Sequence, residues 1–181
     1  MRRFILTGAP GAGKTAILRQ LELDGFDVVE EAASDVIALH QAAGVAEPWT
    51  DAGFTGAIIE LQRLRRARPA PAGVEIQVHD RSAICTLALA RHLGHAVGGE
   101  LVRELRRIAA EAVFERRVLL IRGLGFVTPT AARRIGLEEA LKFEAVHEAA
   151  YRELGYELVF VEPAPLADRV RQIKDTVFGT I

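Results

Sequence analysis

The sequence predicts an α/β fold in which a five-stranded parallel sheet lies between two layers of helices. Short apolar stretches alternate along the 181-residue chain with longer stretches whose apolar residues recur at helical spacing. The apolar stretches are too short for helices and are rich in β-branched residues, which favours buried strands. Strands that alternate with helices pair in parallel, so this order predicts a three-layer α/β/α architecture.

The strands are expected where four to six residues, mostly apolar or alternating in polarity, lie between turn residues. The segment 118–121 is wholly apolar and has a β-branched residue at each end, which is typical of a central strand covered on both faces. The predicted strands, in chain order, are 3–7, 26–29, 74–79, 118–121 and 157–161.

The helices are expected between these strands, and capping or stop residues mark several of their ends. Behind the first strand, Ile17, Leu18 and Leu21 have helical spacing, and Asp24-Gly25 supplies a stop. Ser82 is placed to cap the helix that follows the third strand. The later helices are predicted at about 32–42, 53–67, 82–93, 100–114, 137–154 and 166–177, with loops at 47–51 and 68–73.

The length and composition of the chain limit the classes of protein to which it can belong. A single domain over residues 1–181 is the default for this length. The formal net charge of −1 argues against a protein that binds nucleic acid by neutralising phosphates. No apolar run approaches bilayer length, the N-terminus has no signal-peptide pattern, and the single cysteine excludes an intrachain disulfide. We therefore expect a cytoplasmic monomer or homodimer with neither a membrane nor a nucleic-acid partner.

Residues 8–15 are the most informative segment, because they fit the phosphate-binding loop (P-loop) pattern G-x-x-x-x-G-K-[ST] between the first strand and the first helix. Glycines let the backbone wrap a phosphate, and the following helix directs its free N–H groups at the anion. We expect Lys14 to reach the β- and γ-phosphates of ATP and the Thr15 hydroxyl to hold Mg²⁺. The predicted nucleotide-binding residues are Gly8, Ala9, Pro10, Gly11, Ala12, Gly13, Lys14, Thr15 and Ala16.

Two strand-end segments are expected beside this loop, since ligands of parallel sheets bind beyond the C-terminal ends of the strands. Asp80 is placed to hold Mg²⁺ with Thr15, and Arg81 to pair with a carboxylate or grip substrate. Only one of Glu30 and Glu31 can face the crevice, because adjacent strand side chains point to opposite sides, and we predict Glu31. A carboxylate there would accept a proton from an acceptor hydroxyl, or would orient the acceptor together with Asp80. The alternative is that both residues are a solvated helix start.

Residues 122–136 are interpreted as a lid, because they combine glycine, proline and paired arginines without periodicity. Arg133 or Arg134 would neutralise charge that spreads over a transferred phosphoryl group. The alternative is a basic loop on the surface. Residues 163–171, after the last strand, are predicted to form the wall beside the nucleotide base.

Several other conspicuous residues are given structural interpretations. Cys85 falls on an apolar helix face and is interpreted as a core thiol. Trp49 is interpreted as a loop residue rather than as a ring-stacking one. The histidines lack the clustered ligands that a metal site needs. The run Arg63, Arg65, Arg66 and Arg68 is interpreted as a solvated helix face.

The combined motifs resemble the AAA_28-type ATP-binding proteins, a P-loop family that includes the kinase domain of nicotinamide riboside kinase/regulator proteins and the Ttd14-like proteins. The resemblance covers nearly the whole chain and implies a nucleoside-kinase-like fold, Mg-ATP binding and transfer to a small molecule. It matches Lys14 and Thr15, Glu31, the pair Asp80-Arg81, and Arg133 or Arg134 to the family's functional positions. The segments that carry it are GAPGAGKT, VVEEAA, HDRS and EEALKFEAVHEAAYRELGYELVFVEP.

The chain departs from many members of that family at three places that bear on the acceptor. Ser34 stands where many relatives have an arginine, and Cys85 stands near a position where many have an acid. Ala131-Ala132 replaces the acid that precedes the lid arginine. Recognition of the acceptor is therefore the property that the resemblance transfers least.

Two classes of function remain open from the sequence. The first is an ATP-dependent small-molecule kinase with a nucleoside-like or other hydroxyl-bearing acceptor; a resistance-type phosphotransferase acting on an antibiotic would differ only in that acceptor. The second is a regulatory module that hydrolyses ATP or GTP slowly. The chain has no Asn-Lys-x-Asp segment for reading guanine and is too short for the helical lid domain of an AAA+ machine. The strand-end carboxylates and lid arginines favour the kinase.

Overall fold

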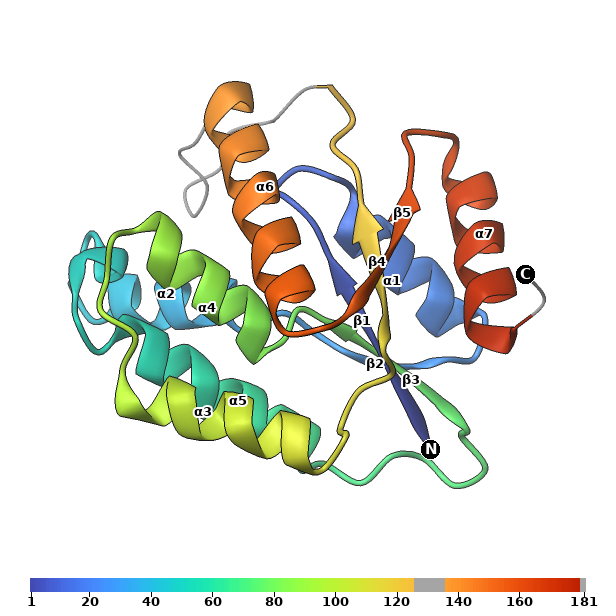
Figure 1. Ribbon diagram of the computed structural model, residues 1–181, viewed down its shortest axis with the longest axis horizontal. Coiled ribbons are helices and arrows are strands. Elements are labelled where there is room, and N and C mark those ends of the chain that lie inside the picture. Colours follow the sequence, from blue (N-terminus) through green and yellow to red (C-terminus); the bar gives the residue numbers. More distant parts are fainter. Residues whose placement is uncertain (126–135, 180–181) are drawn as a thin grey trace.

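The structure, a computed structural model, describes residues 1–125 and 136–179, and its centre is one five-stranded parallel sheet (Figure 1). The order β2-β3-β1-β4-β5 puts β1 in the middle, so the segment that follows β1 leaves from the centre of the sheet. Leu6 of β1 pairs in register with Asp80 of β3, which brings the two strand ends together. The strands are β1 Arg2–Thr7, β2 Asp27–Val29, β3 Ile76–Asp80, β4 Arg117–Ile121 and β5 Glu157–Val161.

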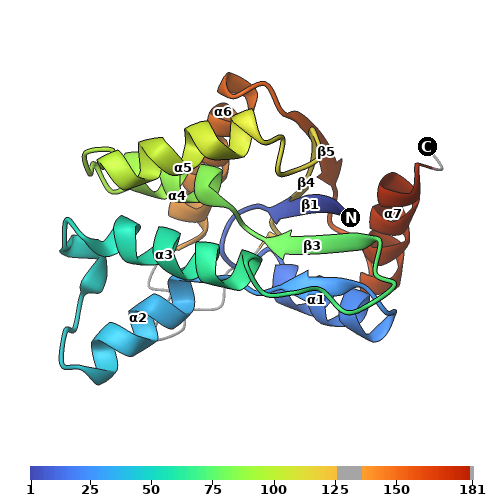
Figure 2. The same ribbon diagram turned by 90° about the horizontal axis from the view of Figure 1, so that it is seen from below.

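Helices cover both faces of the sheet, which confirms the predicted three-layer α/β/α fold. In Figure 1, α1 and α7 lie on one side of the strands, and the helices from α3 to α6 lie on the other. Figure 2 shows α2 and α3 on the side toward which β3 points. The helices are α1 Lys14–Leu23, α2 Ala33–Ala42, α3 Phe54–Arg66, α4 Ala83–His92, α5 Gly99–Ala110, α6 Leu137–Glu153 and α7 Leu166–Phe178, with a short 3₁₀ helix η1 at Pro48–Thr50.

Successive side chains of β1 point to opposite faces of the sheet and pack into the two main hydrophobic clusters of the core. Phe4 and Leu6 point to α1 and α7 and pack with Ile17 and Ile173. Ile5 points to the other face and packs with residues of α4, α5 and α6, Tyr151 among them. Because successive strand residues face opposite sides, a central strand that is apolar throughout serves both layers.

Most predicted bounds lie within one residue of those in the structure, and the larger differences occur at three places. The helix expected to reach residue 114 ends at Ala110, because Ala112 takes a left-handed backbone with φ 45° and turns the chain. The loop predicted at 47–51 contains the helix η1, which Pro48 starts with its fixed φ. The third strand begins at Ile76 rather than 74 and includes Asp80.

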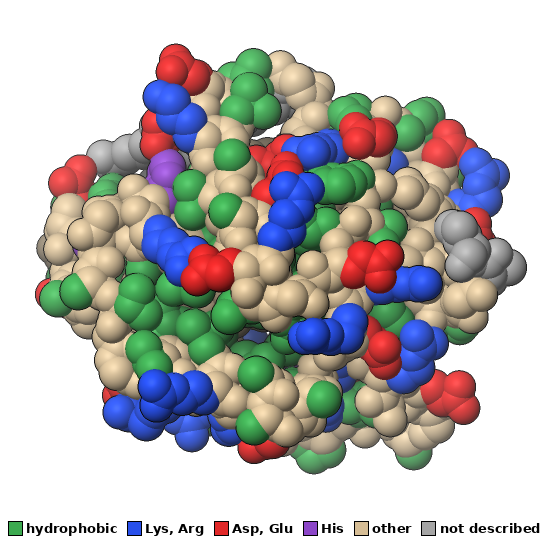
Figure 3. Space-filling model, in the orientation of Figure 1, with side chains coloured by type: hydrophobic (Ala, Val, Ile, Leu, Met, Phe, Trp, Pro, Cys, Tyr) green, Lys and Arg blue, Asp and Glu red, His purple; other side chains and the backbone are tan. Residues whose placement is uncertain are grey.

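Charged side chains of both signs are interspersed over most of the face in Figure 3, in keeping with the formal net charge of −1. Several of them form ion pairs, such as Arg91 with Glu153 at 2.7 Å. Within residues 1–125 and 136–179, no helix has the length and apolar character needed to cross a membrane.

Candidate active site

The P-loop connects β1 to α1, and the side chain of Lys14 folds back to hydrogen-bond the backbone of the loop. Gly8, Gly11 and Gly13 have φ values of 129°, 85° and 82°, a region that favours glycine. The Nζ atom of Lys14 donates to the carbonyl oxygens of Gly8 at 3.0 Å and Ala9 at 2.8 Å. Among the described residues no side chain caps the N-terminus of α1, so its first N–H groups are available to an anion.

The backbone around Gly8 leaves no room for a side chain. An added Cβ would overlap the carbonyl oxygen of Ile121, and φ of 129° is itself strained for any other residue. We expect Gly8→Ala to lower the free energy of unfolding by more than about 2 kcal/mol, measured by urea denaturation. Gly25→Ala is the matched control, since Gly25 also has a positive φ of 90° but open space around its Cβ. Equal losses in the two variants would contradict the steric argument.

Four charged residues from separate segments line one cavity of about 330 Å³ beside the P-loop. Lys14 comes from α1, Glu31 from the segment after β2, and Asp80 and Arg81 from the end of β3. Thr15 also lines the cavity, whereas Ala16 is exposed on α1. The structure therefore brings together every predicted catalytic residue that lies in its described part.

Glu31 is held by both of its carboxylate oxygens. Its Oε1 lies 3.2 Å from Nε of Arg81, and its Oε2 accepts from the hydroxyl of Ser34 at 2.5 Å. Burial raises the pKa of Glu31, but Arg81, Ser34 and Lys14 outweigh that effect and hold the pKa below its ordinary value. Glu31 is therefore ionised at neutral pH. Glu30 is exposed and pairs with Arg19 away from the cavity.

Asp80 is buried, with 7% of its surface exposed, and its Oδ1 has no hydrogen-bond partner among the described residues. Burial raises the pKa of Asp80, and the charges of Lys14 and Arg81 offset this only in part. Asp80 lines the same cavity as Thr15, and its unpartnered carboxylate oxygen fits Mg²⁺, which binds to proteins through one or two oxygen ligands and keeps several waters. Asp80 and Thr15 are the residues that would hold it.

Lys14 shares this low-dielectric environment. Burial, followed by the nearby charge of Arg81, lowers the pKa of Lys14 to about 8, although Asp80 and Glu31 act in the opposite direction. Without a bound ligand, the cavity therefore destabilises the charged form of Lys14, whereas a bound phosphate would stabilise it.

Arg81 has an unusual backbone for an arginine, with φ of 75°. The backbone N–H of Arg81 donates to the carbonyl oxygen of Leu6 at 2.9 Å. Backbone hydrogen bonding to β1 therefore continues one residue past the end of β3. The side chain, 11% exposed, contacts Glu31 through Nε and His147 through Nη1.

A large part of the cavity lining is apolar. Aromatic and aliphatic side chains from η1, α3, α4 and α6 form this apolar wall, and the polar groups of Gln62 and Thr86 lie among them. A cavity that combines charged groups with an apolar wall suits a small molecule that carries a polar reacting group on a flat apolar body. The side chains of the wall include Trp49, Phe54, Ile58, Leu89 and Phe143.

Cys85 lines the cavity and is buried, as expected for a core thiol. Its Sγ lies 3.2 Å from Oγ1 of Thr7 and 3.1 Å from the hydroxyl of Tyr151. The Tyr151 hydroxyl is in turn 2.9 Å from Oγ of Ser82. These contacts connect the end of β1 and the start of α4 to Tyr151 of α6.

The interpretation of the arginine run as a solvated helix face is wrong for Arg65 and Arg66, whereas Arg63 and Arg68 are exposed. The side chains of Arg65 and Arg66 are only 12% and 13% exposed. Arg65 donates to the backbone carbonyls of Glu30 and Glu31 and pairs with Asp35, and so fixes the segment that carries Glu31. Arg66 pairs with Glu104 at 2.6 Å. Four arginines within the six positions 63–68 resemble a solvated face, and only tertiary contacts distinguish Arg65 and Arg66 from the other two.

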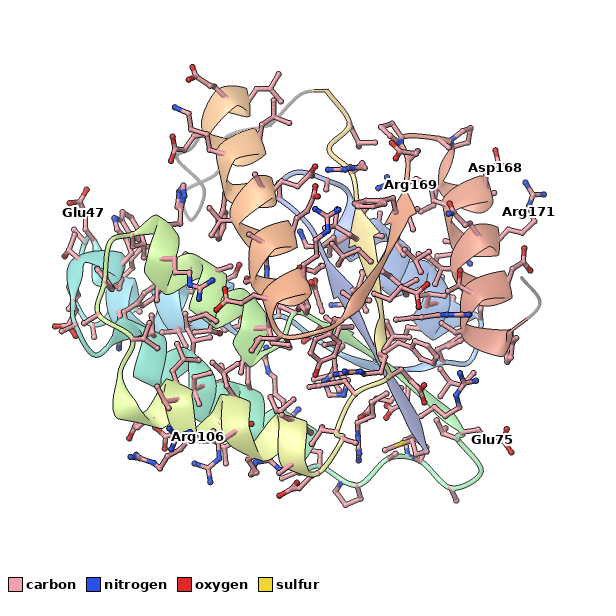
Figure 4. All side chains as sticks on the ribbon, in the orientation of Figure 1. Glu47, Glu75, Arg106, Asp168, Arg169 and Arg171 are labelled. Atoms are coloured by element: carbon pink, nitrogen blue, oxygen red, sulfur yellow. The ribbon has the colours of Figure 1, made fainter. Side chains whose placement is uncertain are left out.

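Arg169 is a further residue that the sequence did not single out, although it lies in the segment predicted to wall the nucleotide base. It is buried, and its Nη2 donates to the carbonyl oxygen of Ala12 in the P-loop at 2.6 Å. Figure 4 shows Arg169 on the side of α7 that faces the sheet, whereas Asp168 and Arg171 point away from it. Arg169 thus ties the start of α7 to the P-loop.

The predicted lid lies mostly outside the part of the chain that the structure describes, and so do Arg133 and Arg134. Of that segment, Arg122 is described and pairs with Glu144 and Glu148 at 2.5 Å each. The lid and its arginines remain predictions.

Three comparisons with known proteins bear on this geometry. Residues 3–169 match the family model AAA_28, an AAA domain, and no curated protein matches the chain. Deoxyadenosine kinase from M. mycoides with dCMP and dCDP bound superposes with a TM-score of 0.65 at 12% identity, covering 99% of this chain and 100% of that one. The same kinase with dCTP bound gives 0.61 at 13% identity, with the same coverage. NadR protein in complex with NR gives 0.62 at 19% identity, covering 88% of this chain and 43% of that one.

At these identities the structural likeness shows the fold, and it confirms the predicted nucleoside-kinase-like form of the P-loop fold. The family is shown by the extent of its match, which leaves out only the first two residues and those after 169. The resemblance stated from the motifs is thereby confirmed. This chain belongs to the AAA_28 family of P-loop proteins.

Proposed function

We propose that this protein is an ATP-dependent small-molecule kinase that transfers the γ-phosphate of ATP to a hydroxyl of a nucleoside-like or other small acceptor. The observation that carries the proposal is the cavity of about 330 Å³, which is lined by the P-loop residues Lys14 and Thr15, by Glu31 and by aromatic side chains. A slow regulatory ATPase has no use for a second compartment of this kind beside its P-loop, whereas a kinase must hold an acceptor there.

The nucleotide would bind on the P-loop, where the positive-φ glycines open the backbone and the N-terminus of α1 faces the phosphates. Lys14 would exchange its bonds to the Gly8 and Ala9 carbonyls for phosphate oxygens. Mg²⁺, held by Thr15 and Asp80, supplies neutralisation of phosphate charge when bound. Arg169 would keep the P-loop in place from behind through Ala12.

Glu31 would act as the general base. As the acceptor oxygen forms its bond to the γ-phosphorus, its proton passes to the Glu31 carboxylate, and the bond from that phosphorus to the β,γ-bridging oxygen of ATP breaks to leave ADP. Arg81 and Ser34 hold the carboxylate in place for this step. The charge of Arg81 would also stabilise the negative charge that develops on the transferred group.

The apolar wall of the cavity supports an acceptor with a flat ring. Trp49, Phe54 and Phe143 offer aromatic surface, and the Gln62 amide, with the Thr86 hydroxyl 3.5 Å from its Oε1, offers donors and acceptors for ring substituents. A nucleoside combines such a ring with the hydroxyl that the charged residues of the cavity would activate.

The test is ADP production from Mg-ATP by the purified protein, alone and with pools of nucleosides, sugars and aminoglycosides. Mass spectrometry would search each pool for a product heavier by one phosphoryl group, and Lys14→Ala would give the background. Acceptor-dependent ADP with such a product in the nucleoside pool is the expected result. ADP release that no pool changes, with no phosphorylated product, would overturn the kinase in favour of the regulatory ATPase.

A further inference from the structure

His147, on α6, is a fully buried histidine to which the sequence assigned no function. Both of its ring nitrogens have hydrogen-bond partners. Nδ1 lies 2.8 Å from the carbonyl oxygen of Phe143, one helical turn earlier, and Nε2 lies 3.0 Å from Nη1 of Arg81. The ring therefore connects the backbone of α6 to a charged residue of the cavity.

The chemistry of these two partners fixes where the histidine proton lies. A carbonyl oxygen only accepts, so Nδ1 must carry the hydrogen and donate to Phe143. A guanidinium only donates, so Nε2 must offer its lone pair to Arg81. Burial, followed by the charge of Arg81, holds the pKa of His147 well below its ordinary value, which keeps the ring neutral as this arrangement requires.

The ring is also fixed in orientation by its neighbours. The centroids of the Phe143 and His147 rings lie 4.3 Å apart, and the His92 ring stacks on Phe143 with a centroid distance of 4.5 Å. Nε2 of His92 lies 2.9 Å from Oε1 of Glu139, also on α6. A ring packed and bonded in this way presents its Nε2 lone pair in one direction.

Arg81 depends on such a fixed acceptor. An arginine side chain has several rotatable bonds, and ordering it costs conformational entropy. Nε of Arg81 faces Glu31 at 3.2 Å, while Nη1 faces His147 at 3.0 Å. The two contacts hold the guanidinium from two sides, so the contact that Arg81 makes with the Glu31 carboxylate depends on His147.

We infer that His147 is a positioning residue: it holds the Arg81 guanidinium from α6, and Arg81 in turn aligns the Glu31 carboxylate toward the acceptor. The consequence for phosphoryl transfer rests on the proposed kinase function. The tautomer of His147 and its bond to Arg81 do not, so the two ideas can fail separately.

The first test needs no substrate. Long-range ¹H–¹⁵N spectra of protein labelled at histidine report which ring nitrogen carries the hydrogen, and His147→Gln assigns the resonances. We expect His147 to be neutral with hydrogen on Nδ1 from about pH 5 to 8, and Arg81→Met to shift its Nε2 resonance. Hydrogen on Nε2, an ordinary titration near pH 6.5, or no response to Arg81→Met would overturn the inference.

The second test separates positioning from packing once an acceptor is known. Glutamine can offer an amide oxygen to Arg81, whereas leucine fills the space without an acceptor. His147→Leu should lower kcat for acceptor phosphorylation by about 10- to 100-fold with the KM for ATP within about twofold, and His147→Gln should restore most of it. In an Arg81→Met background, His147→Leu should have little further effect.

Equal losses of kcat in the leucine and glutamine variants would contradict a positioning role, as would an undiminished effect of His147→Leu in the Arg81→Met background. Failure of the proposed function has a different signature: the wild-type protein yields no phosphorylated acceptor from any pool, while the spectra still show hydrogen on Nδ1 and a bond to Arg81.

Discussion

Glu31→Gln is expected to reduce acceptor phosphorylation by about 10²- to 10⁴-fold while nucleotide affinity changes by less than about threefold. Glutamine keeps the shape of the side chain but cannot take up the acceptor proton, and it leaves Arg81 without its carboxylate partner. The P-loop contacts of Lys14 do not involve Glu31, so nucleotide binding should persist. Steady-state kinetics with the acceptor and calorimetric titration with a non-hydrolysable ATP analogue measure the two quantities.

Glu30→Gln is the matched control for this change. Glu30 is adjacent in sequence and carries the same charge, but it is exposed and pairs with Arg19 on the outside. Removing a surface ion pair of this kind changes stability by no more than about 1 kcal/mol and should leave transfer unchanged. Transfer that survives Glu31→Gln would identify a different base, and Asp80 would be the next carboxylate to test.

The parts of the fold that local sequence determines were predicted closely. The P-loop, its flanking strand and helix, and the position of Asp80 at a strand end follow from short motifs and from the rule for parallel sheets. The order in which five strands and their helices follow each other was enough to predict the three layers, and the structure confirms them. Element bounds shifted by a few residues where a backbone turn such as that at Ala112 intervenes.

Residues that act through distant contacts were not predictable in the same way. Arg65 reaches Glu31 across 34 positions of sequence, and Arg169 reaches Ala12 across 157. His147 meets Arg81 only because α6 packs beside the end of β3. No spacing rule of a helix or strand relates such pairs, so their partners become visible only when the layers are assembled.

Lys14→Met is expected to lower ATP turnover by at least about 10²-fold, because the lysine supplies positive charge to the β- and γ-phosphates in a water-poor site. Methionine retains the length and apolar stem of the side chain. The same change should leave the nucleotide-free protein about as stable as the wild type. The lowered pKa of Lys14 corresponds to about 3 kcal/mol of net destabilisation at neutral pH, from burial and the charge of Arg81, and removing the amine relieves it. Losing the two bonds to Gly8 and Ala9 offsets this by about 1 kcal/mol each.

The pH dependence of nucleotide binding should follow the same lysine, with a sign that the structure determines. In the free protein the pKa of Lys14 is lowered to about 8, whereas a bound triphosphate favours the charged amine and raises it again. Nucleotide binding should therefore take up a proton above about pH 8, so affinity stays level below about pH 7 and falls toward pH 9. Calorimetry in two buffers of different ionisation enthalpy measures the uptake, and Lys14→Met should abolish it. Affinity that is level from pH 7 to 9 in the wild-type protein would mean that Lys14 is already charged in the free site, and the desolvation argument for its pKa would then be wrong.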